Sequence, residues 1–214
     1  MASKSARREK SIERIKSAAL DLFVTRGYNE TTVDGIAAQA GLSKGNIYHY
    51  FSSKQELALD LLKSFSDELQ QLEWGIVREA DCTRDKIRTG IRVFFEWVKE
   101  SPQAALYFFG PEGSKVVEGE RQPPWSMGPA EALEQLFVRG QAVGEVKETL
   151  PWLLTLSFKI PIQLALDYAS GVIECDIVEY VDDVAEMVWG AVRSDSAARD
   201  ELLEKVNAVE QERG

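Results

Sequence analysis

The chain has 214 residues, of which 44% are hydrophobic, and a formal net charge of −10 at pH 7. This length and apolar content predict either one large domain or a small domain attached to a larger one. The single histidine, His49, and the two widely separated cysteines match no zinc-finger spacing, and they predict neither a disulfide nor a bound metal or cofactor. Only His49 is available for a Ser–His–Asp or Cys–His catalytic site, so the composition argues against an enzyme.

The N-terminal and apolar segments predict a cytoplasmic protein that does not span a membrane. Residues 1–10 are polar and basic, unlike a secretion signal. The longest apolar stretch, residues 150–169, has the length of a membrane span but contains Lys159, Asp167 and two prolines. We interpret this stretch as a helix that other helices cover.

The charge is divided unevenly along the chain. Residues 1–54 contain nine Lys and Arg against five Asp and Glu, a net +4, whereas residues 55–214 contain 16 against 30, a net −14. Such a division suggests a DNA-facing N-terminal domain on a body that DNA repels. The alternative is an acidic, solvated surface with a basic end that has no function.

The first predicted element is an amphipathic helix that ends near Arg26, with Gly27 as its left-handed cap. Its apolar positions are Ile15, Ala18, Ala19, Leu22 and Phe23. Because these residues follow helical spacing, we expect them to face one core.

Two further helices are predicted to form a helix-turn-helix. The first begins at Thr31 or Thr32, where Thr31 and Asp34 have the spacing of a capping box, and ends at Gly41. Ser43 is predicted to cap the second, which has about seven residues and therefore needs tertiary support. Its inward residues are Ile47 and Phe51, and its outward residues are Lys44, Gly45, Asn46, Tyr48 and His49. This outward face lacks acids and carries groups that can hydrogen-bond base edges and phosphates.

These residues belong to a continuous motif. The motif comprises Thr31-Thr32-Val33, Ile36-Ala37, the run from Ala40 to Phe51, and Lys54-Gln55-Glu56-Leu57. It resembles the DNA-binding signature of the TetR family over residues 12–62 without a gap. The resemblance implies an all-α fold with a three-helix head in residues 1–54 and a helical ligand-binding and dimerisation domain in residues 55–214.

The resemblance also implies which residues contact DNA. Those meeting the major groove are Ser43, Lys44, Gly45, Asn46, Tyr48 and His49, and those contacting phosphate are Thr32, Tyr48, His49 and Lys54. Four of these positions have alternatives: Tyr48 as a cover of the head core, His49 as a surface residue without a role, Thr32 as a helix cap only, and Lys54 as a solubilising residue. Residues 3–10 either add a basic arm or form a terminus that makes no contact.

Helices are predicted through the rest of the chain, and no strand pattern stands out. Ser53 and Glu56 have capping-box spacing at the start of a long fourth helix. Its apolar positions are Leu57, Leu61, Leu62, Phe65, Leu69 and Leu72. Further helices are predicted over residues 83–100, from a Ser101 cap with Pro102 in the first turn, and over residues 129–143, 147–169, 176–189 and 196–209. Residues 110–129 are predicted to form a loop with a helical turn near residues 114–119.

The body is predicted to form a dimer and a pocket. Residues 150–170 and 176–190 carry more apolar surface than one body needs to cover, and the resemblance implies a four-helix bundle across a twofold axis. The alternative is an unusually apolar monomer core. The aromatic residues proposed to line a pocket are Phe94, Phe95, Trp97, Tyr107, Phe108, Trp125, Trp152 and Phe158.

The predicted function is therefore a homodimeric repressor that binds a palindromic operator and releases it when a small molecule binds. The acidic body and its aromatic residues favour a cationic aromatic effector, whereas Lys159 favours an anionic one unless its side chain simply reaches the surface. Activation remains an alternative because it depends on operator position. A second alternative is a protein of the same fold whose body recruits a protein partner.

Overall fold

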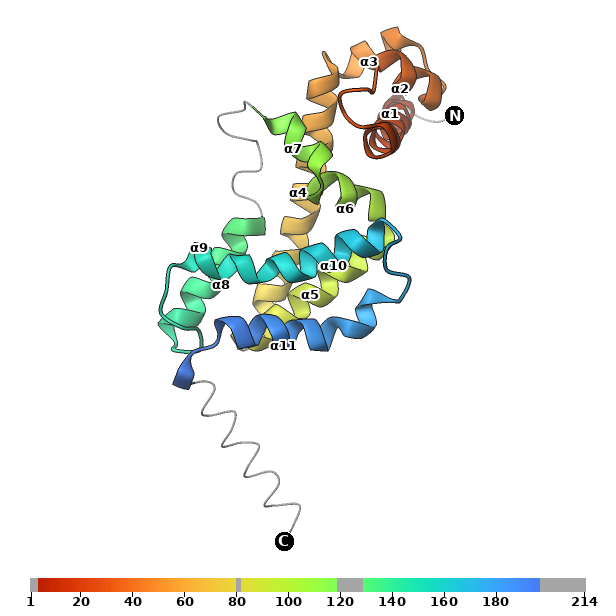
Figure 1. Cartoon of the computed structure of the whole chain (residues 1–214). Helices are drawn as coiled ribbons and strands as arrows, with labels where there is room; N and C mark the ends of the chain where they lie inside the picture. Colours follow the sequence, from red (N-terminus) through yellow and green to blue (C-terminus); the bar gives the residue numbers. More distant parts are fainter. Residues whose placement is uncertain (1–3, 80–81, 119–128, 197–214) are drawn as a thin grey trace. The chain divides into compact units, whose positions relative to one another are not determined.

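The computed structural model describes residues 4–79, 82–118 and 129–196, and these residues form helices and no β-strand (Figure 1). The helices are α1 (Lys4–Arg26), α2 (Val33–Ala40), α3 (Lys44–Tyr50), α4 (Lys54–Glu79), α5 (Thr83–Glu100), α6 (Pro102–Phe109), α7 (Pro111–Val117), α8 (Pro129–Ala142), α9 (Pro151–Leu154), α10 (Lys159–Ala169) and α11 (Val181–Val192). Two short 3-10 helices are η1 (Thr155–Phe158) and η2 (Ile177–Tyr180). The all-α prediction is confirmed. No helix among the described residues is both long and apolar enough to cross a membrane.

The chain divides into two compact units. The described residues of the first lie within Met1–Glu68, Trp97–Ser126 and Leu166–Ile173, and those of the second within Leu69–Glu96, Met127–Ala165 and Glu174–Gly214. The sequence places a domain boundary after residue 54, where α4 begins. The first unit also contains α6 and α7, which follow α5 in the chain.

The first unit has its core where the helical spacing places it. Its fully buried side chains include Ile15, Ala19, Phe23, Ile36, Ile47, Leu57 and Tyr107. Phe23 of α1 stacks on Tyr107 of α6, with ring centroids 5.5 Å apart. The head core thus includes a residue from α6, which lies far from the head in sequence.

The start of α2 differs from the predicted capping box. Thr32 is the N-cap, and its hydroxyl accepts a hydrogen bond from the Gly35 backbone N–H at 3.1 Å. Thr31 is 3% exposed, and its hydroxyl donates to the carbonyls of Leu22 and Gly27 instead. Of the two predicted starts, the structure therefore has Thr32, and the predicted capping box of Thr31 and Asp34 is wrong because Thr31 satisfies carbonyls at the end of α1.

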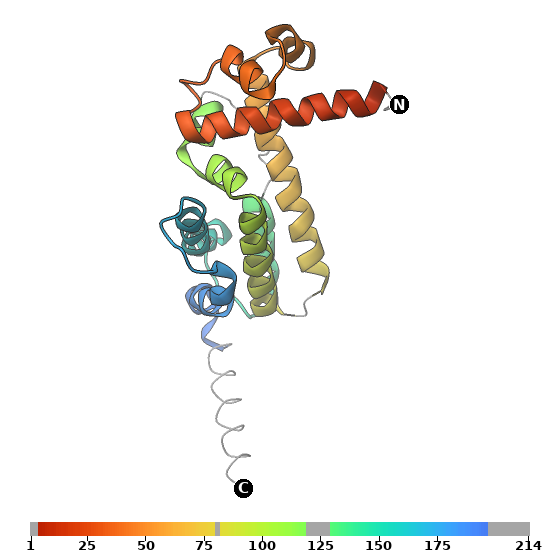
Figure 2. The ribbon, with the colours of Figure 1, turned by 90° about the vertical axis from the view of Figure 1, so that its right-hand side faces the viewer.

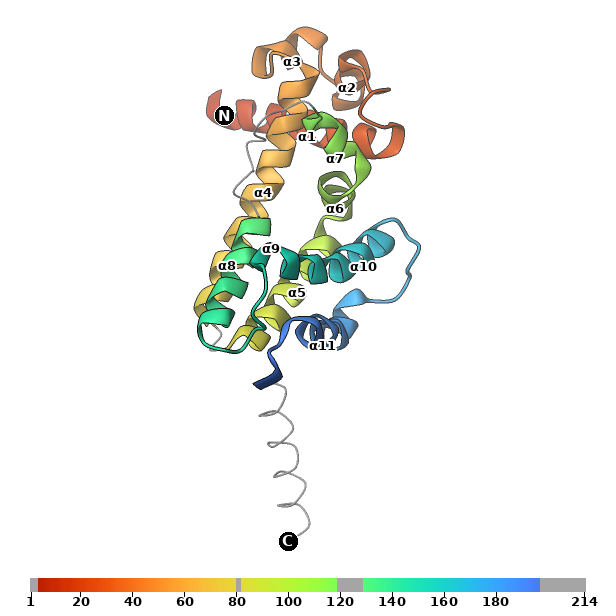
Figure 3. The same ribbon diagram turned by 60° about the vertical axis from the view of Figure 1, so that its left-hand side comes forward.

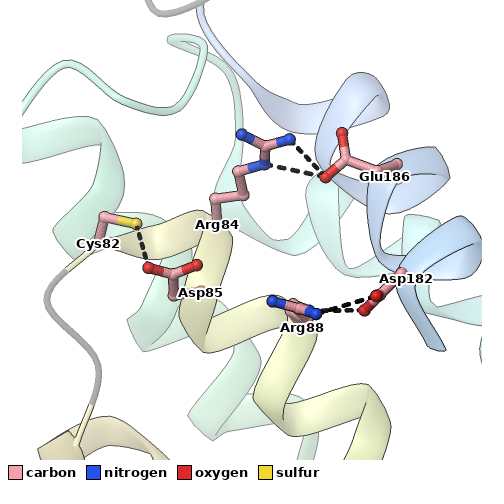
Figure 4. Close-up of polar contacts among 6 residues, drawn as sticks. All are labelled: Cys82, Arg84, Asp85, Arg88, Asp182 and Glu186. Atoms are coloured by element: carbon pink, nitrogen blue, oxygen red, sulfur yellow. Dashed lines mark hydrogen bonds and ion pairs between the residues drawn. The ribbon is translucent and has the colours of Figure 1, made fainter. Parts of the chain in front are cut away.

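In the second unit, ion pairs connect α5 to α11 (Figure 4). Arg84 contacts Glu186 at 2.7 Å, and Arg88 contacts Asp182 at 2.6 Å. All four side chains are substantially exposed, so these pairs add little stability. The apolar contribution comes from buried residues on both helices, including Ile87, Ile91, Val184, Val188 and Val192.

The predicted helix over residues 147–169 is interrupted. The structure has α9, the 3-10 helix η1 and then α10 in its place, and α9 begins only at Pro151. Pro161 has no N–H and its ring clashes with the carbonyl four residues earlier, Ser157, which lies in η1. The prediction of one continuous helix is wrong because it neglects this effect.

Other body predictions are confirmed or lie outside the described residues. Helix α5 has the predicted bounds, and α7 provides the helical turn within residues 110–129. Pro102 begins α6, but the Ser101 side chain forms no capping hydrogen bond, contrary to prediction. The predicted helix over residues 196–209 lies almost entirely outside the described residues, as does Trp125.

Candidate nucleic-acid interface

Helices α2 and α3 are joined by a short turn that local sequence explains. Gly41 ends α2 in the left-handed region, with φ +62°, which favours glycine. Ser43 then caps α3 by accepting a hydrogen bond from the Asn46 backbone N–H at 3.3 Å. The predicted glycine cap and serine cap are both confirmed, and the two helices form a helix-turn-helix.

Helix α3 presents a polar face to solvent. Ile47 is 2% exposed and anchors the helix, and Phe51 follows it into the core at 7% exposure. The exposed residues at the start of α3 and along it are Ser43, Lys44, Gly45, Asn46, Tyr48 and His49. The Tyr48 side chain is 49% exposed, so it does not cover the head core. The structure therefore brings the predicted groove-facing residues together on one short helix.

An acid of α2 already binds Lys44. The Lys44 ammonium contacts an Asp34 carboxylate oxygen at 2.8 Å, and this hydrogen bond and charge raise the pKa of Lys44. Both side chains are mostly exposed. A base or phosphate oxygen that takes Lys44 must compete with Asp34, whose carboxylate then returns to water at little cost.

Lys54 lies in a different environment from the other predicted contacts. Its ammonium donates to the carbonyls of Tyr28 at 2.7 Å, Thr31 at 2.9 Å and Asn29 at 3.4 Å. It also lies 4.3 Å from the centre of the Tyr28 ring. Burial lowers the pKa of Lys54. These contacts hold together the loop between α1 and α2, residues 27–32.

The first two turns of α1 form a basic, exposed extension. Side chains from Ser5 to Lys10 are exposed, and no apolar residue among them is larger than alanine. In the view of Figure 2 this end of α1 extends past α2 and α3. The sequence predicts no helix at residues 4–10, whereas the structure begins α1 there. Both predicted alternatives, a basic arm and a terminus without contacts, are compatible with this helix.

Some residues that support the helix-turn-helix belong to no predicted site. The Arg14 guanidinium of α1 donates to the Gly41 carbonyl at 3.4 Å, directly at the turn. Asp21 accepts hydrogen bonds from Gln39 of α2 at 2.6 Å and from Gln103 of α6 at 3.1 Å. No sequence motif marks these residues, because the partners in each hydrogen bond are 18 to 82 positions apart in sequence.

The proposed pocket residues differ in burial and in their unit. In the first unit, Trp97 and Tyr107 are buried and Phe108 is half-buried. In the second unit, Phe95 is buried, Phe94 and Phe158 are half-buried, and Trp152 is 54% exposed. Two of the buried residues already have polar partners: Trp97 Nε1 donates to Glu68 at 3.1 Å, and the Tyr107 hydroxyl donates to the Ala58 carbonyl at 3.4 Å. In the described parts of the chain, no group of three or more His, Cys, Asp or Glu is placed to hold a metal.

The N-terminal region matches a known family, and about half of the chain matches curated relatives. The family described as "Bacterial regulatory proteins, tetR family" matches residues 15–61. The chain is 45% identical over 103 residues to the HTH-type transcriptional repressor KstR2 of Mycobacterium tuberculosis, covering 48% of this chain and 51% of that protein. It is 35% identical over 101 residues to the HTH-type transcriptional activator FasR of Mycolicibacterium smegmatis, covering 47% of this chain and 45% of that protein. The chain thus spans about half the length of the curated relatives it matches.

Solved structures resemble the whole fold. A TetR family transcription regulator from Marinobacter aquaeolei has a TM-score of 0.72 at 21% identity, covering 88% of this chain and 98% of that one. The transcriptional regulator FadR from Bacillus subtilis, solved in complex with stearoyl-CoA, has a TM-score of 0.69 at 21% identity, covering 84% of this chain and 98% of that one. At these identities the likeness shows the fold. Together with the family match at residues 15–61, it shows a TetR-family N-terminal domain in a chain whose fold resembles that of solved TetR family regulators.

Proposed function

We propose that the protein is a homodimeric repressor that binds a palindromic operator through α3 and releases it when a small molecule binds to the body. The observation that carries the DNA-binding part is the exposed, acid-free face of α3, which Ser43 caps and Ile47 anchors. Such a face suits major-groove readout.

The decisive experiment is selection of binding sites from random duplex DNA by the full-length protein at low salt. We expect enrichment of a palindrome, because a twofold dimer presents two identical heads to two half-sites. Absence of any enriched sequence would contradict the proposal. A non-palindromic site would leave DNA binding intact but contradict the dimer.

An exposed apolar surface supports the dimer. Within the second unit, the large apolar residues that are more than 40% exposed on α9, η1, α10, η2 and α11 include Trp152, Leu153, Leu156, Ile160, Tyr180 and Met187. Exposed apolar side chains on elements that pack against one another are typical of an association surface. We place the twofold contact there, and sedimentation analysis should give twice the 24.0 kDa mass of the chain.

One solved structure and the charge of the body suggest two classes of effector. The FadR structure with stearoyl-CoA makes long-chain acyl-CoA thioesters the first compounds to test. A cationic aromatic compound is the second class, because the body is acidic. A ligand that weakens operator binding must bind the free form more tightly, and a coupling of about 1 to 3 kcal/mol gives a roughly 5- to 150-fold loss. The similarity to the transcriptional activator FasR keeps activation as a second candidate.

Asn46→Ala should relax sequence preference. The exposed Asn46 side chain can make paired hydrogen bonds to an adenine edge, and losing such a pair costs about 1 to 3 kcal/mol, or roughly 5- to 150-fold in affinity for the preferred site. Binding to unrelated DNA should change little. Titrating the selected operator and its single-base variants measures this difference, and equal losses on every sequence would show that Asn46 does not read a base.

The basic extension of α1 should add to non-specific affinity. Arg7 and Arg8 are exposed, so we expect Arg7→Gln/Arg8→Gln to make the slope of log affinity against log salt shallower by about 2. The matched control is Arg26→Gln/Arg139→Gln, which removes two exposed arginines outside residues 4–10. Identical slopes for the two variants would mean that residues 4–10 make no phosphate contact.

A further inference from the structure

The loop between α1 and α2 is held from a second direction by α7. The Tyr28 backbone N–H donates to Glu112 Oε2 at 2.7 Å. Lys54 of α4 holds the carbonyls of the same loop. The segment that leads directly into the helix-turn-helix is therefore held by two helices: α7 accepts a hydrogen bond from its amide, and α4 donates to its carbonyls. Figure 3 labels both helices.

Glu112 is well suited to hold this amide. Its side chain is only 19% exposed and forms an ion pair with Lys115, one turn along α7. The hydrogen bond from Lys115 lowers the pKa of Glu112, and the bond from the Tyr28 N–H acts in the same direction, while burial opposes them. The carboxylate is thus ionised at neutral pH, and a hydrogen bond to an ionised acceptor is about twice as strong as a neutral one.

The loop and α7 lie so close together at Glu112 that neither can shift easily. Gly27 has φ +91°, and a Cβ there would lie 3.3 Å from Glu112 Oε2. Helix α7 is fixed behind it, because a Cβ on Gly113 would lie 2.3 Å from the Tyr107 carbonyl oxygen and 3.1 Å from Leu62 Cδ2. Glu112 therefore projects from a helix packed against α4 and the end of α6.

Helix α6 makes a second connection to the same head. Gln103 donates to Asp21 of α1, which also accepts from Gln39 of α2, and Phe23 stacks on Tyr107. The Gln103 and Asp21 contacts are exposed, and the aromatic contact is apolar. Glu112 provides the more buried polar contact between α6–α7 and the head.

We propose that Glu112 is a positioning residue for DNA recognition: by holding the Tyr28 amide it fixes the orientation of α2 and α3 relative to α6 and α7. This inference rests on the proposed function. In a dimer, the spacing of two half-sites is matched only if each head has one orientation. A head released from α7 can tilt, so it should tolerate altered spacing and bind the correct spacing less well.

The test compares Glu112→Ala with Glu118→Ala. Glu118 lies at the exposed end of the same helix, so its substitution removes the same charge without this contact. The first measurement is amide hydrogen exchange of the free protein. We expect Glu112→Ala to speed exchange of residues 27–32 by tenfold or more, with residues 15–23 unchanged and Glu118→Ala like the wild type.

The second measurement is the ratio of affinities for the selected operator and for the same operator with one base pair inserted at its centre. We expect Glu112→Ala to reduce this ratio about tenfold, consistent with the loss of a charged hydrogen bond. A role in folding alone would lower the active fraction but leave the ratio unchanged. Such a result would overturn the proposal.

The exchange measurement needs no operator, so it separates the two proposals. If no sequence is selected, DNA recognition fails whatever Glu112 does. Unchanged exchange in residues 27–32 would overturn the Glu112 contact even where an operator is found.

Discussion

Gly140→Ala is expected to destabilise the second unit by about 2 kcal/mol, because a methyl group there would overlap two buried neighbours. The added Cβ would lie 2.5 Å from Val146 Cγ2 and 2.8 Å from Thr83 Oγ1. Val146 is 1% exposed and Thr83 is 4% exposed, and both are β-branched and stiff. The helical preference of alanine over glycine returns only about 0.5 to 1 kcal/mol.

The backbone around Gly140 cannot move away easily. The Gly140 carbonyl accepts from the N–H groups of Glu145 and Val146, and the Glu145 carboxylate accepts from the Thr83 N–H at 2.8 Å. Val146 also forms an isolated β-bridge with Arg193. Relief of the overlap would therefore break hydrogen bonds.

Gly190→Ala provides the control for this prediction. Gly190 lies in α11, and a Cβ there would meet nothing within 4 Å. We expect this variant to be unchanged or more stable by up to about 1 kcal/mol. Urea unfolding at one protein concentration measures both, since dimerisation couples stability to concentration. Equal stability of the two variants would show that the packing around Gly140 is looser than described.

Lys54→Ala is expected to lower the thermal midpoint by about 5 °C, because it leaves the loop between α1 and α2 without its cation. The substitution removes hydrogen bonds to the Tyr28 and Thr31 carbonyls and the contact with the Tyr28 ring. A hydrogen bond from a charged donor contributes about 1.5 to 3 kcal/mol, and the partial exposure of Lys54 reduces that figure.

The same variant tests the predicted phosphate contact. If Lys54 also binds phosphate, its loss should weaken binding to all DNA sequences and make the salt slope shallower by about one unit. Lys63→Ala is the stability control, because Lys63 lies on α4 in an exposed pair with Asp67. A Lys54→Ala protein with the wild-type midpoint but a shallower salt slope would contradict the loop-holding role and support phosphate binding alone.

Local sequence determines much of this protein. The end of α1, the glycine cap of α2, the serine cap of α3 and the bounds of α5 all match expectation. Each depends on a side chain or glycine within a few residues of the feature it forms, so periodicity and capping chemistry suffice. The exposed face of α3 follows in the same way, because burying Ile47 places its polar neighbours outside.

Tertiary structure decided the features whose partners are distant. Thr31 and Thr32 are both acceptable caps by sequence, and burial of Thr31 against the end of α1 separates them. The sequence around Lys54 does not distinguish it from a surface lysine, but in the structure carbonyls of the loop of residues 27–32 bind its ammonium. Glu112 bonds an amide 84 positions earlier. Sequence spacing cannot indicate such pairs, because which side chains meet depends on how the helices pack, and the free energy of each contact depends on the burial that this packing creates.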